Sequence, residues 1–443
     1  MNAHTPAGTH TPRTADLVRG EVCRIVIERM AHGGVGIGTV DGRVVFVAGG
    51  LPGDTCQVRI EQVKKRFARG SVVAVLEASP LRVDQRCPAA AAGAGCCDFG
   101  IVNPDAELGL KVDILRDQLM RLGGFTTLPA IESATLDPAS GWRTRVRLGV
   151  DAQGRAGVHK ARSKELVTSV ACAQVVPGLL DGVVGPWARR FTPGAQVIVA
   201  ATEDGRQIVE ARRASRGRRA ERATEVIEGE KFAPVRVGSD VFHVAATAFW
   251  QAHVAAPEAY CRLVERMCAL PGQAEGNPEA SAGASSRRVA WDLYGGTGIF
   301  VPALNRALGA SAQVHTVDSA ESAHGAQHPA LAGIDHRIHV NAVERAVGLL
   351  PAPEAVVLDP PRTGAGEAVV AAVAAKRPRV VVHIGCDPAT LARDLNLWRQ
   401  SGYWVTDCQL IDAFPGTHHF EVVCRLVPSG DGDGADTDDA SRR

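Results

Sequence analysis

Long apolar segments are missing from this sequence. No run approaches the roughly 20 apolar residues that a helix needs to cross a bilayer. The opening stretch MNAHTPAGTHTPRTADLVRG also lacks the apolar core of a signal peptide. These absences argue against a helical membrane protein and a secreted one, so we expect a cytoplasmic protein with no membrane partner.

A surplus of charge of one sign is missing too. The 49 Lys and Arg residues nearly balance the 48 Asp and Glu residues, and the formal net charge is +1. A surface that binds nucleic acid must therefore be a local basic patch. In a cytoplasmic chain of 443 residues, 11 cysteines do not indicate a disulfide framework, and clustered ones are candidates for metal binding or catalysis.

The N-terminal region reads as a run of short strands. EVCRIVIERM, GRVVFVAG, DTCQVRIEQV and RGSVVAVLEAS are separated by glycine-rich turns such as AHGGVGIG. This pattern predicts a small, OB-like β-barrel over residues 18–82. Its KKRFARG stretch suits a phosphate backbone and a stacked base, or else forms a plain solvated hairpin. The RNA-binding candidates are Lys64, Lys65, Arg66 and Phe67.

Residues 83–245 predict a central, mixed α+β domain. It begins with the cysteine loop RCPAAAAGAGCCDFG and continues into alternating, antiparallel strands that carry Arg143, Arg145 and Arg147 on one face. The basic run at 211–222 is either an RNA-facing loop or a solvated surface.

From residue 246 to 428, apolar strands alternate with alanine-rich helices, which predicts a doubly wound, Rossmann-like α/β sheet. We expect a low-complexity insertion at 271–288 and disordered tails at 1–17 and 429–443.

A nucleoside-binding pattern opens this last domain. VAWDLYGGTGIF reads as strand, glycine turn and helix, and its spacing differs from the dinucleotide fingerprint G-x-G-x-x-G. Asp318 ends the next strand, 26 residues after Asp292. An acid at that place can accept both hydroxyls of a ribose. The pattern therefore fits a nucleoside cofactor without a pyrophosphate, such as S-adenosylmethionine.

Two later strands end in reactive groups. AVVLDPPRTGAG places Asp359 and two prolines after a buried strand, and HIGCDPATLARDL places Cys386 between a strand and a helix start. A lone cysteine is usually a small core residue. At this turn we expect an exposed sulfur, and the positive helix end favours its thiolate form.

These stretches together resemble the RNA uracil-5-methyltransferases, whose N-terminal domain is a TRAM domain. The motifs are FWQAH at 249–253, DLYGGTGIF at 292–300, LDPPRTG at 358–364, HIGCDPATLARDL at 383–395 and DAFPGTHHFEVV at 412–423. The resemblance implies that Cys386 is the nucleophile and Glu421 the general base. Its implied S-adenosylmethionine contacts are Gln251, Asp292, Tyr294, Gly295, Gly296, Gly298, Asp318 and Asp359.

The resemblance implies methyl transfer to carbon 5 of a uridine in RNA through a cysteine adduct. We expect ribosomal RNA rather than transfer RNA as the partner, and a monomeric chain. Two alternatives stay open: a methyltransferase acting on cytosine or a base nitrogen, and an idle RNA-binding protein or chaperone. Methylation of a base nitrogen would need no thiol nucleophile, and an idle RNA-binding protein would have no reason to keep both Cys386 and Glu421.

Many members of this family hold a 4Fe–4S cluster with C-x5-C-x2-C and one distant cysteine. Here the corresponding residues are Cys87, Cys96, Cys97 and Cys172, and the adjacent pair and longer first gap depart from that pattern. A cluster, a zinc ion and four reduced thiols are all left open. No third ligand is evident beside the histidine pair in THHFEVV, so we expect no metal there.

Overall fold

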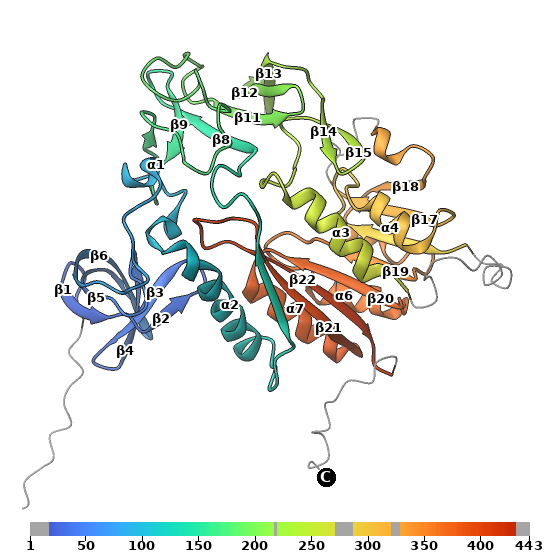
Figure 1. The fold of residues 1–443 in the computed structure, drawn as a ribbon, viewed down its shortest axis with the longest axis horizontal. Helices are drawn as coiled ribbons and strands as arrows, with labels where there is room; N and C mark the ends of the chain where they lie inside the picture. The colour runs from blue at the N-terminus through green and yellow to red at the C-terminus, as the bar shows by residue number, and fades with distance from the viewer. Residues whose placement is uncertain (1–16, 217–218, 271–286, 320–327, 431–443) are drawn as a thin grey trace, which may run out of the picture. The chain divides into compact units, whose positions relative to one another are not determined.

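The computed structural model describes residues 17–216, 219–270, 287–319 and 328–430, and Figure 1 shows its course. In this part of the chain no helix is long and apolar enough to span a membrane. The chain divides into two compact units, Met1–Asp84 with Ile101–Asn103 and Gln85–Gly100 with Pro104–Arg443.

The first unit is a curled, six-stranded sheet in the order β1-β5-β6-β4-β3-β2. Its two edge strands are separated by only two residues in the chain, and the Glu28 amide between them donates to the carbonyl of Ile37 on β3. Leu17, predicted to be in a disordered tail, is buried in the core of this unit. The strands are β1 (Val22–Val26), β2 (Arg29–Ala31), β3 (Val35–Val40), β4 (Arg43–Ala48), β5 (Thr55–Val63) and β6 (Phe67–Glu77).

The glycine-rich stretch AHGGVGIG was predicted to be a turn, and this prediction was wrong for its second half, which forms β3. A Cβ atom on Gly36 would lie 2.6 Å from Ile27 Cγ2, and one on Gly38 would lie 2.4 Å from the Val26 carbonyl oxygen. These glycines therefore serve close approach between chain segments rather than a turn.

The second unit contains the predicted antiparallel strands as a six-stranded sheet in the order β10-β9-β8-β11-β12-β13. The β12–β13 hairpin carries the basic run, but the side chains of 213–222 lie outside the described residues. A separate hairpin, β14–β15, follows. The strands are β8 (Arg145–Val150), β9 (Ala156–His159), β10 (Leu166–Val167), β11 (Gln196–Thr202), β12 (Gly205–Arg216), β13 (Arg219–Glu228), β14 (Ala233–Val237) and β15 (Asp240–Val244).

The second unit also contains an eight-stranded sheet in the order β18-β17-β16-β19-β20-β22-β21-β7. The first five strands run parallel, and β22 returns antiparallel to β20. The strands are β7 (Ile131–Thr135), β16 (Val289–Leu293), β17 (Gln313–Asp318), β18 (Asp335–Val340), β19 (Ala355–Leu358), β20 (Val380–Gly385), β21 (Tyr403–Asp412) and β22 (Glu421–Pro428).

Helices cover both faces of this sheet (Figure 1). Val357 packs in the core that β19 shares with α3 and α4, whereas its neighbours Val356 and Leu358 are buried on the opposite face. Burial on both faces explains the near-continuous apolar strands of the sequence. The helices are α1 (Pro88–Ala91), α2 (Pro104–Arg121), α3 (Ala256–Cys268), α4 (Val301–Leu308), α5 (Val343–Ala346), α6 (Gly366–Ala375) and α7 (Pro388–Gln400).

One strand of this sheet comes from the segment predicted to be central. β7 pairs in parallel with β21, and residues on both sides of the predicted 245/246 boundary belong to one compact unit. A five-residue strand at the edge carries little periodic signal, so its partner is set by tertiary pairing rather than by local sequence.

Candidate active site

Five chain segments meet at the end of the eight-stranded sheet where its parallel strands have their carboxyl ends. The parallel strands β16, β17, β19 and β20 all end there, as carboxyl ends of parallel strands must. Glu421 begins β22 at the same edge. The antiparallel register pairs Gly385 with Val422, so the next step places Cys386 opposite Glu421. Two residues that lie 35 positions apart are thus neighbours at the sheet edge.

A cavity of about 670 Å³ opens at this edge. Its volume lies in the range of small-molecule sites. Seven of the ten candidates for catalysis and cofactor binding line it, and Gly295 lines a smaller pocket beside it. The seven are Gln251, Tyr294, Gly296, Asp318, Asp359, Cys386 and Glu421.

The glycine turn after β16 holds the backbone close to Asp292 and Asp318. Tyr294 has φ 61°, a conformation that is strained for a bulky residue. A Cβ atom on Gly295 would lie 2.3 Å from Asp292 Oδ2, so only glycine fits there. The Gly296 amide donates to Asp318 Oδ2 at 3.0 Å.

Asp292 and Gly298 support this turn from outside the cavity. Burial raises the pKa of Asp292 to about 7, and Thr316 donates to its Oδ2 at 3.2 Å. Gly298, with φ 75°, closes the turn with its amide 2.8 Å from the Gly295 carbonyl oxygen. Neither residue is among those that line the cavity or its side pocket.

Two carboxyl groups on the cavity wall have raised pKa values. Burial raises the pKa of Asp359 to about 7. Burial, and then the neighbouring Asp359, raise the pKa of Glu421 well above its usual range. Glu421 Oε2 is buried and has no hydrogen-bond partner among the described residues. The pKa of Asp359 places its ionisation near neutral pH, and the raised pKa of Glu421 favours its protonated form.

Cys386 lies in the predicted turn, but its electrostatic environment is the opposite of the one expected. Burial, Glu421 and Asp359 raise the pKa of the Cys386 thiol to about 12, and Arg362 offsets only part of this. The helix start does not favour the thiolate, because Asp387 caps α7 and its Oδ1 accepts from the amides of Ala389 and Thr390 at 3.0 Å. The thiol is therefore the resting form.

Several residues of the cavity were not singled out in the sequence. Phe249 is 73% exposed, so its ring is open to solvent at the cavity wall. Arg143 was grouped with two arginines on a strand face, yet it lines the cavity, and Arg145 instead donates to the carbonyls of Ala245, Ala246 and Ala248. The additional lining residues are Arg143, Phe249, Trp250, Ala252, Thr297, Ser319, Pro360, Pro361, Arg362, Phe414 and His419.

The motifs FWQAH, DLYGGTGIF, LDPPRTG and DAFPGTHHFEVV contain most of these residues and were the available signal, whereas no motif contained Arg143. His418 hydrogen-bonds to Asp98, and burial lowers the pKa of His419 to about 3. Among the described residues, neither histidine belongs to a group of three neighbouring metal ligands.

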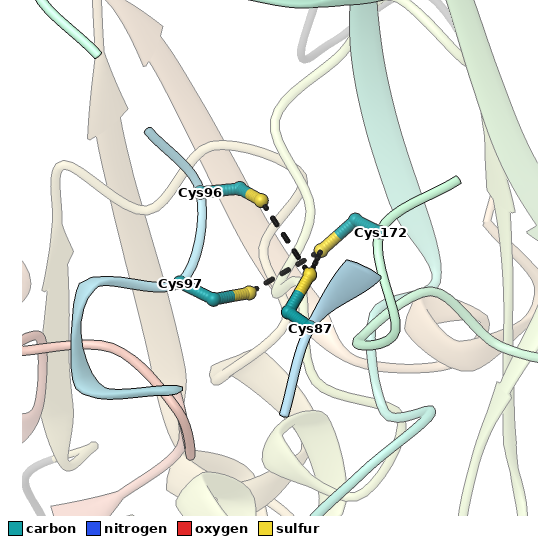
Figure 2. A group of neighbouring side chains, drawn as sticks. All are labelled: Cys87, Cys96, Cys97 and Cys172. Carbon is teal, nitrogen blue, oxygen red and sulfur yellow. Dashed lines mark hydrogen bonds between the residues drawn. The ribbon is translucent and has the colours of Figure 1, made fainter. Parts of the chain in front are cut away.

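The four cysteines of the predicted metal set come together in space (Figure 2). All four sulfur atoms lie within 4.8 Å of one another, although Cys172 is 75 residues from Cys97. Cys87, Cys97 and Cys172 are buried, and Cys96 is half-buried.

In the first unit, the RNA-binding candidates form the β5–β6 hairpin. Lys64, Lys65 and Arg66 are exposed at its turn. The Phe67 ring lies edge-on to Phe46, with ring centroids 5.6 Å apart, and the Arg69 guanidinium lies 5.7 Å from the Phe67 centroid.

Comparison with known proteins adds evidence from outside the molecule. The TRAM domain model matches residues 17–73, and the tRNA (uracil-5-)-methyltransferase model matches residues 352–427. A protein named uncharacterized RNA methyltransferase from Corynebacterium efficiens is 52% identical over 414 residues, which cover 93% of this chain and 96% of that protein. One with the same name from Streptomyces avermitilis is 33% identical, covering 93% of this chain and all of its own.

Among solved structures, the crystal structure of Pyrococcus abyssi tRNA (uracil-54, C5)-methyltransferase in complex with S-adenosyl-L-homocysteine is similar. The TM-score is 0.65 at 20% identity, and the match covers 91% of this chain and 99% of the other. At this identity the match concerns the fold.

Proposed function

The chain belongs to the S-adenosylmethionine-dependent RNA uracil-5-methyltransferases, and from this premise we propose that it methylates carbon 5 of a uridine through a covalent adduct with Cys386. The single observation that supports the covalent route is that Cys386 and Glu421, from adjacent antiparallel strands, line one cavity. A nucleophile and a base are the two groups that this reaction requires.

The same cavity fits the cofactor. Gly296 lines the cavity and has no protein atom within 4 Å of where a Cβ atom would lie, so its backbone is open to a ligand. Asp318 lies beside this turn and is our candidate for the ribose hydroxyls, and Gln251, Tyr294 and Asp359 complete the proposed contacts. When bound, S-adenosylmethionine supplies the methyl group.

Cys386 performs the first step. Carbon 5 of uracil is a weak nucleophile, and addition of the Cys386 sulfur to carbon 6 gives carbon 5 the electron density of an enolate. Because the pKa of the thiol is raised to about 12, its proton must pass to solvent as the bond between sulfur and carbon 6 forms. Arg362, whose positive charge opposes that shift, favours the developing thiolate.

Glu421 performs the last step. After methylation, carbon 5 still carries its proton, and Glu421 Oε2 is the proposed acceptor, which requires this carboxyl to be in its ionised form at that step. Loss of this proton lets the electrons return to the ring, the bond between sulfur and carbon 6 breaks, and Cys386 is released.

RNA containing 5-fluorouridine tests the proposal. A base can remove a proton from carbon 5 but cannot remove the fluorine that replaces it, so the adduct cannot break down. After incubation with the cofactor, the enzyme should therefore remain covalently joined to the RNA on a denaturing gel. Cys386→Ala should abolish this band while S-adenosylhomocysteine still binds by calorimetry. A band that persists in the variant, or normal turnover by it, would assign the nucleophile elsewhere.

We expect ribosomal RNA to be the acceptor, whereas the matched family model and structure carry transfer RNA in their names. Tritium-methyl labelling of total RNA from a strain lacking this chain, followed by mapping of the acceptor, decides between them.

The first unit is our candidate RNA clamp. Each phosphate neutralised in single-stranded RNA contributes about −0.7 to the log–log salt dependence of binding. Replacing Lys64, Lys65 and Arg66 with alanine should therefore flatten the slope by about 2 and leave S-adenosylhomocysteine binding unchanged. An unaltered slope would show that the hairpin is merely solvated.

A further inference from the structure

We propose that Cys87, Cys96, Cys97 and Cys172 bind one zinc ion in a tetrahedral, four-thiolate site, in place of a 4Fe–4S cluster. This inference is independent of the proposed reaction. It concerns a second site, built by the loop that carries α1 and by the segment that precedes Gln174.

The distances between the sulfur atoms carry the proposal. Zinc binds thiolates at about 2.3 Å, so a regular tetrahedron places its sulfurs about 3.8 Å apart. The separations are 3.9 Å for Cys87 and Cys96, 3.7 Å for Cys87 and Cys172, and 3.4 Å for Cys97 and Cys172. All four sulfurs lie within 4.8 Å of one another. Figure 2 shows the four side chains pointing toward one another.

A 4Fe–4S cluster fits these positions poorly. In such a cluster each thiolate binds a different iron, at a different corner of a cube, and the sulfurs stand farther apart than those around a single ion. Cys96 and Cys97 are adjacent in the chain, which makes it harder for their sulfurs to reach separate corners. Around one ion, adjacent ligands need only face the same point.

The surroundings suit a buried, anionic zinc site. The Ala173 amide donates to Cys87 Sγ at 3.5 Å, and apolar side chains, including Ala89 and Val175, pack around the four cysteines. Arg143 lies close enough to interact electrostatically with the sulfurs of Cys96, Cys97 and Cys172. Four thiolates and one zinc ion carry two net negative charges, which this arginine partly balances.

The zinc site would hold two segments of the cavity wall in position. The Phe99 amide donates to the Gly416 carbonyl at 3.1 Å, and the His418 amide donates to Asp98 Oδ1 at 3.0 Å. The segment held in this way leads directly into Glu421. On the other side, the Arg143 amide donates to the Gln174 carbonyl at 2.6 Å. The zinc ion is therefore structural, and it supports two parts of the cavity at once.

Metal analysis of the full chain, isolated without oxygen, tests the proposal. We expect one zinc per chain, no acid-labile sulfide, and an X-ray absorption shell of four sulfurs at about 2.3 Å. Four irons with four sulfides per chain would overturn the proposal. So would a metal-free chain whose four thiols react freely and take up no added zinc.

Variants locate the ion. Cys97→Ser should lose zinc and lower the melting temperature, because binding energy at a structural zinc site is folding energy. The matched control Cys23→Ser removes a half-buried cysteine of the first unit and should keep one zinc. If Cys97→Ser fails to fold, the wild-type chain is titrated with a mercurial reagent that modifies its thiols. A chelator that changes colour on binding zinc then measures how much zinc is released per modified thiol. Full zinc retention in Cys97→Ser, or release that does not follow thiol modification, would contradict the site.

Discussion

Two groups of acids in the second unit, all buried except the half-buried Asp359, differ in their partners. Glu107 and Asp412 share the ammonium of Lys111, at 3.0 and 2.7 Å. Glu107 also accepts from the Gly416 amide at 2.6 Å and pairs with Arg86 at 3.1 Å. At the cavity, the neighbour of Glu421 is another acid, Asp359. Burial and Asp359 raise the pKa of Glu421, and the positive charge of Arg362 lowers it by a smaller amount.

Burial alone does not separate the two groups. Burial raises the pKa of Glu107 too, so the difference lies in hydrogen-bond partners. The carboxyl of Glu107 is satisfied on both oxygens, whereas Glu421 Oε2 has no partner among the described residues. A satisfied buried acid maintains the fold, and an unsatisfied one is kept ready for a ligand or a proton.

The largest effect should come from Glu421→Gln, on activity rather than on stability. Glutamine keeps the size of the side chain but cannot take the carbon 5 proton, so turnover should fall by roughly 10²–10⁴-fold. Enzyme joined to methyl-labelled RNA should accumulate on a denaturing gel, and the double variant with Cys386→Ala should show none. Normal turnover would make Glu421 a structural acid like Glu107.

Removing the cation from the paired group should produce the next largest effect. Lys111→Met removes the buried ammonium that Glu107 and Asp412 share, which should lower the free energy of unfolding by about 3–5 kcal/mol. All six tryptophans lie in the second unit, so tryptophan fluorescence during denaturation reports on this unit. Lys160, whose side chain is 41% exposed and pairs with Glu165, is the matched control, and Lys160→Met should barely move the midpoint of unfolding. Equal shifts in both variants would remove the contrast.

The unpaired group should also make stability depend on pH. Because the pKa of Asp359 is raised to about 7, the folded chain holds a proton that the unfolded chain releases near pH 4. Its stabilising contribution is full below about pH 4 and is lost as the pH rises to about 7. Asp359→Asn should remove this loss of stability with rising pH. The loss is a few kcal/mol at most, since each pKa unit corresponds to about 1.4 kcal/mol. Parallel denaturation profiles of both proteins at pH 5 and pH 8 would contradict it.

Asp318 should show the smallest effect, since the Gly296 amide already satisfies one of its oxygens. Losing charged hydrogen bonds to a ribose costs about 1.5–3 kcal/mol, so Asp318→Ala should weaken S-adenosylhomocysteine binding about tenfold or more in calorimetry. Asp335 begins β18, at the end of the parallel strands away from the cavity. Asp335→Ala should therefore leave the affinity for S-adenosylhomocysteine unchanged. An unchanged constant for Asp318→Ala would mean that another group holds the ribose.

Local sequence predicted the segments of the site. The buried run of β20 followed by Pro388, a residue suited to the first turn of a helix, correctly placed Cys386 between strand and helix. The glycines of AHGGVGIG misled because glycine serves turns and close approaches alike. Arg143 was missed as a cavity residue because its place there depends on a segment far along the chain.

The sequence by itself determined which strands exist, the order of the motifs along the chain and the chemistry that their residues can perform, because these follow from apolar periodicity and residue type. Only the tertiary structure decided which form, protonated or ionised, the side chains of the site adopt. Cys386 stands opposite Glu421 through the pairing of β20 with β22, and the pKa of its thiol is raised to about 12 rather than lowered. Four cysteines spread from residue 87 to residue 172 likewise reach one point only through folding. Charge interactions and metal geometry depend on distance in space, which spacing along the chain does not fix.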